Sequence, residues 1–110
     1  MNVEDFYQRV ALCTPVSREE EILLAQEMKQ GAEAAKERLV QGYLPCVAAY
    51  LKRTNFVSLE LVYRCCAALE QAVVAFNFMQ DGETFAHRLS WHLRQETTRY
   101  IADSRSGKTL

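Results

Sequence analysis

The chain has 110 residues, of which 49% are hydrophobic and 25% are charged, and its formal net charge is −1. This composition is typical of one globular domain and excludes a disordered or fibrous chain. The small net charge excludes a polycationic protein that binds nucleic acid over its whole surface. Only four glycines and two prolines are available for turns. The sequence therefore predicts an all-α fold, a compact multi-helix bundle of about five helices.

Hydropathy and cysteine usage indicate the compartment. No apolar run reaches the length of about 20 residues that a membrane span needs, and the first five residues are acidic where a secretory signal would be basic. We therefore expect a cytoplasmic protein without a membrane partner. Cys13, Cys46, Cys65 and Cys66 lack the spacing of a metal site or a redox motif. We expect buried thiols, and neither a metal nor another cofactor.

The first strong helix signal lies between Ser17 and Gly31. Ser17 and Glu20 have the spacing of a capping box, in which the hydroxyl accepts a hydrogen bond from a free backbone N–H. The run of three glutamates that ends at Glu21 falls in the first turn, where the helix dipole favours negative charge and where we expect solvated side chains. Gly31 is a natural C-terminal stop. These features predict a helix that starts after Ser17 and ends before Gly31.

Glycine and proline divide the next segment. A second helix is predicted from about residue 32 to residue 41. Gly42 and Pro45 are expected to interrupt it, because proline disrupts a helix interior but suits a first turn. A third helix is therefore predicted over residues 44–53, and residues 54–57 are predicted to form the connection that follows.

Ser58 caps a fourth predicted helix that reaches about Phe76. Its apolar residues recur at helical spacing and share one wide face, which is typical of a helix buried in a bundle. These residues are Leu61, Val62, Cys65, Cys66, Leu69, Ala72, Val73 and Phe76. The opposite face mixes polar with small apolar residues, namely Glu60, Tyr63, Arg64, Ala67, Glu70, Gln71 and Val74. That face is either exposed to solvent or a site for a protein partner.

Residues 77–82 are predicted as a loop, and a fifth helix follows to about residue 103. Its apolar face holds Phe85, Leu89, Leu93, Tyr100 and Ile101. The opposite face holds Arg88, Trp91, Gln95, Thr98 and Ala102. The only tryptophan therefore points away from the predicted core, in line with a glutamine and a threonine. Because tryptophan is usually well buried, this arrangement indicates a binding surface.

The outward face has the parts that a nucleic-acid-reading helix needs. Bases can stack on Trp91, Gln95 or Thr98 can reach base edges, and arginines can bind phosphates. In the alternative interpretation, Trp91 packs against a neighbouring helix and the polar residues are ordinary solvated side chains. No enzyme is predicted, because His87 and His92 lack a nucleophile at motif spacing and the Ser-Gly-Lys-Thr string at residues 106–109 lacks a glycine-rich loop.

Several short strings follow one another in a common order. They are SREEEI at residues 17–22, AKERLV at 35–40, KR at 52–53, SLELV at 58–62, AV at 72–73, WHLRQ at 91–95, TR at 98–99 and IAD at 101–103. Their order and spacing resemble the conserved core of the primary-type sigma factors of bacterial RNA polymerase, over about residues 2–103. The resemblance implies a sigma-like helical domain over residues 1–103, followed by a flexible tail over residues 104–110.

The resemblance implies a role in transcription initiation. Such a domain docks on the clamp of RNA polymerase, and it recognises and helps to melt the minus-ten promoter element. In the family, the residues that match Gln95 and Thr98 contact the base pair at the upstream end of the element, and aromatics that match Phe85 and Trp91 support the melted junction. The expected DNA-binding residues are Phe85, Arg88, Trp91, His92, Arg94, Gln95, Thr98 and Arg99. The expected polymerase- or partner-binding residues are Glu60, Tyr63, Arg64, Ala67 and Glu70.

Several residues depart from the family pattern. Tyr63 and Arg64 stand where the family has a Gln-Glu pair on the clamp-binding helix, and Cys66 replaces an asparagine, so the surface that would contact polymerase has changed. His92 replaces the second tryptophan of a pair and Arg88 replaces a tyrosine, changes that would weaken strand opening.

The sequence contains no later helix-turn-helix domain for the upstream promoter element, so we expect that this chain is not a complete sigma factor and that a second protein could supply that domain. The alternative function is a sigma-like protein-interaction or regulatory module without independent promoter activity. A third reading is a purely structural helical bundle, which would bind neither DNA nor polymerase.

Overall fold

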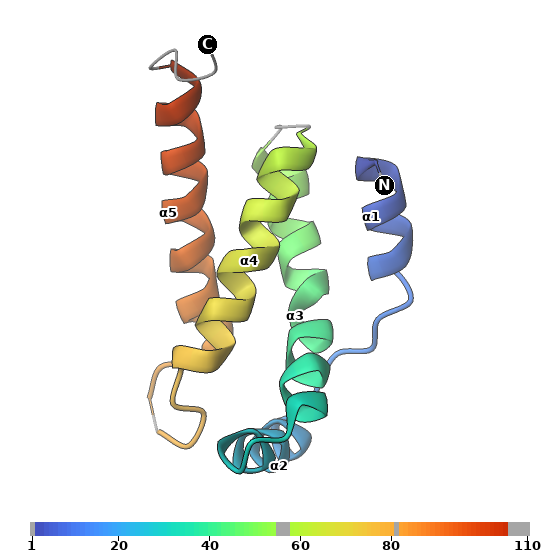
Figure 1. Cartoon of the computed structure of the whole chain (residues 1–110), viewed down its shortest axis with the longest axis vertical. Coiled ribbons are helices and arrows are strands. Elements are labelled where there is room, and N and C mark those ends of the chain that lie inside the picture. Colours follow the sequence, from blue (N-terminus) through green and yellow to red (C-terminus); the bar gives the residue numbers. More distant parts are fainter. Residues whose placement is uncertain (1, 55–57, 81, 106–110) are drawn as a thin grey trace.

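The computed structural model describes residues 2–54, 58–80 and 82–105, and every regular element among them is a helix. The helices are α1 (Val3–Val10), α2 (Arg18–Lys29), α3 (Glu33–Thr54), α4 (Leu59–Ala75) and α5 (Phe85–Arg105). In Figure 1, α3, α4 and α5 lie side by side, α1 packs along α3, and α2 crosses the lower end of the bundle. The predicted all-α bundle is confirmed. Within the described ranges, no helix combines the length and the hydropathy that a membrane crossing requires.

Side-chain caps start four of these helices, including α5, where the Thr84 hydroxyl accepts from the backbone N–H of His87 at 3.1 Å. The Asn2 side chain accepts a hydrogen bond from the backbone N–H of Asp5 at 2.8 Å, and the Asp5 carboxylate accepts one from the backbone N–H of Asn2 at 3.2 Å. This capping box supports α1, a helix that the sequence analysis did not predict. Ser17 accepts from the N–H of Glu20 at 3.1 Å and Ser58 caps α4 in the same way, as predicted.

The predicted break between two helices at Gly42 and Pro45 is wrong, because α3 runs unbroken through both residues. Gly42 is buried against the Val16 side chain, and a Cβ at this position would overlap Val16 Cγ2. The glycine therefore allows the segment before α2 to approach α3 closely rather than ending a helix. Pro45 removes one intrahelical hydrogen bond, which a helix held by packing along its length tolerates.

Glu21 is also placed differently from the prediction of a solvated first turn. Its side chain is only 7% exposed, pairs with Arg18 at 2.7 Å and accepts a hydrogen bond from the Tyr43 hydroxyl of α3. Burial and the neighbouring Glu21 raise the pKa of Tyr43 well above its usual value, so the phenol keeps its proton and remains the donor. The contact joins α2 to α3.

An aromatic cluster fixes the connection between α4 and α5. The ring centroid of Phe85 lies 5.0 Å from that of Phe78, 5.3 Å from that of Phe76 and 4.6 Å from that of Tyr43. Phe78 belongs to the predicted loop but is 2% exposed. The connection is therefore anchored in the core, and α5 begins from a defined point.

The cysteine prediction is only partly right. Cys65 is fully buried, Cys13 and Cys66 are half-buried, and Cys46 is exposed on α3. Burial raises the pKa of Cys65 to about 12 and that of Cys66 to about 11, so both remain protonated thiols at neutral pH.

The fifth helix, predicted to about residue 103, continues to Arg105. Part of the predicted 54–57 connection, Asp81 of the predicted turn, and residues 106–110 of the predicted tail lie outside the described residues.

Candidate nucleic-acid interface

α5 presents a row of exposed side chains on the face opposite the core. Trp91 is 42% exposed, and Gln95, Thr98 and Ala102 are exposed at spacings of three and four residues along the helix. Among the residues that the structure describes, the ring contacts of Trp91 are with its own helix: His92 at 5.1 Å between centroids, and the Arg88 guanidinium 5.7 Å from the ring centroid. This geometry matches the predicted outward orientation rather than packing against a neighbouring helix.

A shallow hollow of about 430 Å³ follows this row. We call it the Trp91 hollow, and it is lined by Trp91, Arg94, Gln95, Thr98 and Arg99. The Thr98 hydroxyl donates to the Arg94 carbonyl at 3.0 Å, so towards a ligand it is available as an acceptor. Gln95 can both donate and accept. The hollow thus combines an aromatic surface, an amide, an acceptor and two cations.

The arginines of α5 differ in whether an acidic side chain already pairs with them. Arg88 donates from Nε and Nη2 to Glu83 Oε1 at 3.1 and 2.8 Å, so its charge is already paired. Arg99 makes one exposed pair with Glu96 at 3.5 Å, which contributes little in water. Arg94 is exposed and makes no ion pair with another described residue. Of the three, Arg94 is the side chain best placed to meet an anionic ligand.

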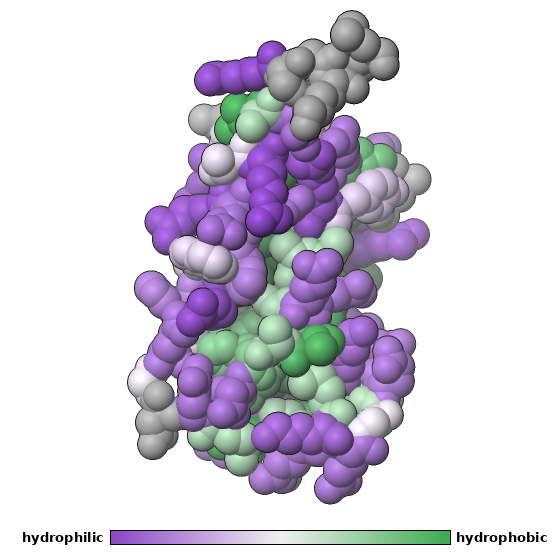
Figure 2. All heavy atoms as spheres, turned by 60° about the vertical axis from the view of Figure 1, so that its left-hand side comes forward, coloured by the Kyte–Doolittle hydropathy of each residue, from purple (hydrophilic) through white to green (hydrophobic). Residues whose placement is uncertain are grey.

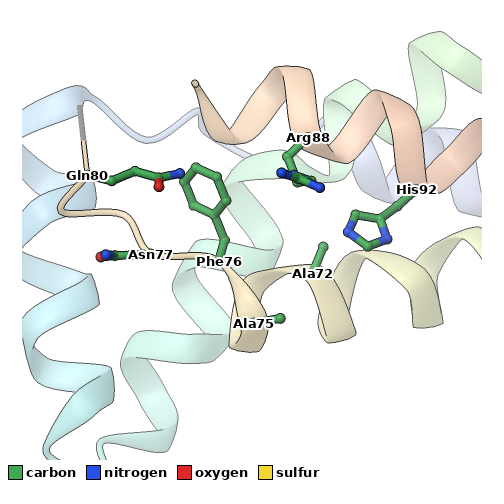
Figure 3. Close-up of a pocket in the computed structure, with 7 residues that line it drawn as sticks. All are labelled: Ala72, Ala75, Phe76, Asn77, Gln80, Arg88 and His92. Carbon is green, nitrogen blue, oxygen red and sulfur yellow. The ribbon is translucent and has the colours of Figure 1, made fainter. Parts of the chain in front are cut away.

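A second cavity lies one turn away, in the seam between α4 and α5 (Figure 3). This α4–α5 pocket has a volume of about 390 Å³. It is lined by Ala72, Ala75, Phe76, Asn77, Gln80, Arg88 and His92. Burial and the Arg88 cation lower the pKa of His92, so its imidazole is neutral at pH 7 and can both donate and accept hydrogen bonds. Its lining offers hydrogen-bonding groups beside one aromatic ring.

The structure places Phe85, one of the expected DNA-binding residues, in the core. Phe85 is 2% exposed and stands at the centre of the aromatic cluster, packed on Phe76, Phe78 and Tyr43. Its role is to anchor the first turn of α5. The hydrophobic periodicity had placed it on the apolar face, and that assignment is the correct one.

The predicted partner surface on α4 is exposed at Glu60, Tyr63, Ala67 and Glu70, with Tyr63 53% exposed. Arg64 is used differently. Its guanidinium pairs with Asp103 at 2.9 Å and with Glu60 at 3.3 Å, and it lies 4.0 Å from Glu96. Because two of these carboxylates belong to α5, Arg64 ties the two helices together.

Sequence reasoning missed Arg53, which is exposed in the last turn of α3 and lines a hollow together with Arg94. The sequence analysis names it only within the KR string at residues 52–53. One signal was available: neither Arg53 nor Arg94 has an acidic residue three or four positions away, so neither can form a local helical ion pair.

Hydropathy varies over the side of the molecule that carries α5. Figure 2, which brings this side forward, shows hydrophilic side chains over its upper half and hydrophobic surface gathered in its lower half. The polar upper part agrees with an α5 surface that faces solvent or a polar ligand.

Comparisons with known proteins identify the family. No family model matches the chain. The chain is 36% identical over 91 residues to the RNA polymerase sigma factor SigA of Clostridium acetobutylicum and 34% identical over 91 residues to SigA of Listeria monocytogenes. Each match covers 80% of this chain but only 24% of the relative, so the chain spans about a quarter of the length of these curated relatives. The predicted resemblance is confirmed, and the chain carries a domain of the sigma factor family.

Proposed function

We propose that this chain recognises promoter DNA during transcription initiation, by binding the opened strand of a minus-ten-like element together with RNA polymerase. The observation that carries the proposal is the exposed row of Trp91, Gln95 and Thr98 in the Trp91 hollow. Its action is non-enzymatic: it binds an opened strand more tightly than a closed duplex, and so shifts the equilibrium towards the open state.

Each side chain of the hollow has a role in this proposal. Trp91 offers a face on which an unpaired base stacks, an interaction that a base inside a duplex cannot make. Gln95 donates to and accepts from a base edge, and Thr98 accepts. Arg94 and Arg99 contact phosphates and contribute affinity without sequence preference.

The α4–α5 pocket supports the same proposal. A base that leaves the stack needs a cavity with an aromatic or apolar wall and with partners for its hydrogen-bonding edge. Phe76 supplies the wall, while Gln80 and His92 supply donors and acceptors around about 390 Å³ (Figure 3). We assign this pocket to a flipped-out base.

A second candidate function is a sigma-like module that binds a protein rather than DNA. The observation that favours it is the exposed apolar surface of α4, where Tyr63 is 53% and Val74 is 61% exposed. The resemblance to sigma factors implies that polymerase would dock on the same α4 surface, around Tyr63, Glu60, Ala67 and Glu70. The two functions therefore differ mainly in whether the α5 surface binds DNA.

Trp91 fluorescence tests the proposal, because Trp91 is the only tryptophan of the chain. The chain is titrated with a single strand that carries a minus-ten-like sequence and, separately, with a scrambled strand, at low and at moderate salt. Quenching that is stronger for the minus-ten-like strand is expected. Equal responses to both strands, or no response, would reject base reading, and size-exclusion chromatography of the chain with and without polymerase core would then test the protein-binding module.

A further inference from the structure

A third concave surface adjoins the Trp91 hollow where α3 meets α5. It has a volume of about 460 Å³ and is lined by Tyr50, Arg53, Thr54, Ser90 and Arg94. We call it the Arg53–Arg94 hollow. Arg53 comes from the last turn of α3 and Arg94 from the middle of α5, so two helices bring one guanidinium each to the same hollow. Its lining contains no acidic side chain.

Neither guanidinium makes an ion pair with another described residue. Three other arginines of α4 and α5 differ in this respect, since Arg64, Arg88 and Arg99 each have a carboxylate partner. Two uncompensated cations that line one hollow repel each other, and an anion bound between them relieves this repulsion. The charge pattern of the hollow therefore favours an anionic ligand.

The hydroxyl groups of the hollow are already used as donors. Tyr50 donates to Thr97 Oγ1 at 2.8 Å, Ser90 donates to the His87 carbonyl at 2.7 Å and Thr54 donates to the Leu51 carbonyl at 2.8 Å. The donors that remain for a ligand are the N–H groups of the two guanidinium ions. Planar guanidinium groups match the oxygens of a phosphate and can bind them in a bidentate manner.

We propose that Arg53 and Arg94 together bind one phosphodiester group of a nucleic acid strand. The inference rests on the proposed function, since the strand is the one whose base stacks on Trp91. Arg94 lines both hollows, so a strand that places a base in the Trp91 hollow brings a neighbouring backbone phosphate to the Arg53–Arg94 hollow. The site fixes the position of the strand along α5 and carries no sequence information itself.

The experiment scans the phosphates of the strand. Single-stranded minus-ten-like oligonucleotides, each with one phosphodiester replaced by an uncharged methylphosphonate, are titrated against the full chain by Trp91 fluorescence. We expect one linkage whose replacement weakens binding by about tenfold, as the loss of a charge-assisted contact does. The same replacement should cause a smaller further loss in Arg53→Ala, because only the Arg94 contact to that phosphate is left to lose. Arg53→Ala should also lower the slope of log K against log salt by about 0.7.

Arg9→Ala is the matched control, since Arg9 is an exposed arginine of α1 without an ion pair to another described residue. Arg9→Ala removes the same charge, but replacement of the critical linkage should weaken strand binding to this variant as much as to the unmodified chain. The proposal is overturned if replacement of each linkage weakens binding to Arg53→Ala as much as to the unmodified chain. It is also overturned if Arg9→Ala gives the same result as Arg53→Ala.

The outcome is separable from that of the proposed function. Equal affinity of the unmodified chain for minus-ten-like and scrambled strands would reject base reading, while a linkage coupled to Arg53 would still support the phosphate site. Sequence preference without such a linkage would reject the phosphate site alone. Absence of binding to either strand would reject both.

Discussion

The Tyr50 hydroxyl of α3 donates a hydrogen bond to Thr97 Oγ1 of α5 at 2.8 Å, and Thr97 donates in turn to the Leu93 carbonyl at 2.9 Å. Thr97 is 7% exposed and lies on the side of α5 that faces the bundle, next in sequence to Thr98 on the exposed side. This relay fixes the rotation of α5 about its axis. The side chains of the Trp91 hollow are therefore held in place before a ligand binds.

Thr97→Val should destabilise the protein by about 1–2 kcal/mol, because it keeps the shape of the side chain but leaves the Tyr50 hydroxyl without its acceptor. Urea unfolding followed by circular dichroism measures the change. Thr98→Val is the control, since Thr98 is exposed and bonds only within its own helix, and its effect should stay within about 0.5 kcal/mol. Equal effects of the two substitutions would show that the relay does not stabilise the fold.

Gln95→Ala should reduce discrimination at one base position by about 1–3 kcal/mol, because a bidentate amide contact to a base edge is lost. The affinities of the variant for strands substituted at single positions measure this. Gln26→Ala, at an exposed position of α2 far along the chain, is the control and should leave discrimination unchanged. A loss that is equal for all sequences would contradict a base-reading role for Gln95.

Arg94→Ala and Arg99→Ala should behave differently from Gln95→Ala, because phosphate contacts do not report the base. Binding should weaken for all sequences by a similar factor, and the slope of log K against log salt should fall by about 0.7 for each contact to a single strand. The loss should be larger for Arg94, since Arg99 shares its charge with Glu96. A change in base preference in either variant would contradict this division of roles.

Arg64→Ala and Asp103→Ala should each lower the urea midpoint, and the double variant should unfold at nearly the same midpoint as the worse single variant. The reason is that both remove the same 2.9 Å contact between α4 and α5, and effects within one contact are not additive. Additive losses would mean that the two side chains act independently. Arg105→Ala, also in the last turn of α5, is the control for removing a positive charge.

Stability should fall on acidification, partly through His92. Burial lowers the pKa of His92 below the ordinary value of 6.5, so in the window below pH 6.5 the unfolded chain binds more protons than the folded chain. The contribution of His92 to the stability of the fold is therefore fully present above pH 6.5 and is lost as the pH falls through the lowered pKa of the folded chain. Between about pH 7.5 and about pH 5.5, His92→Gln should lose less thermal stability than the unmodified protein.

The helices that the sequence predicts well are determined by residues within the helix or directly next to it. Ser17 and Ser58 mark helix starts by side-chain chemistry, and the spacing of Leu61, Leu69 and Leu89 shows which faces are buried. The exposed position of Trp91 follows from the same arithmetic. A pattern that repeats every three or four residues predicts the buried face of a helix even when the partner helix is unknown.

The errors have tertiary causes. Gly42 looks like a helix end, but its small size serves a contact with Val16, which lies 26 positions earlier in the chain. Phe85 was assigned to DNA by resemblance although its own periodicity placed it in the core. The pairing of Arg64 with α5 and the meeting of Arg53 with Arg94 depend on how helices cross, which no local pattern encodes.

The unbroken course of α3 has a mechanical consequence. Its 22 residues form a rod of about 33 Å, at 1.5 Å per residue. The middle of this rod packs against α2 through Tyr43 and Glu21, and its C-terminal end carries Arg53. Two helices joined at Gly42 would have acted as a hinge and absorbed any displacement, whereas a continuous rod passes it on. The α2 contact and Arg53 therefore keep a fixed separation along α3.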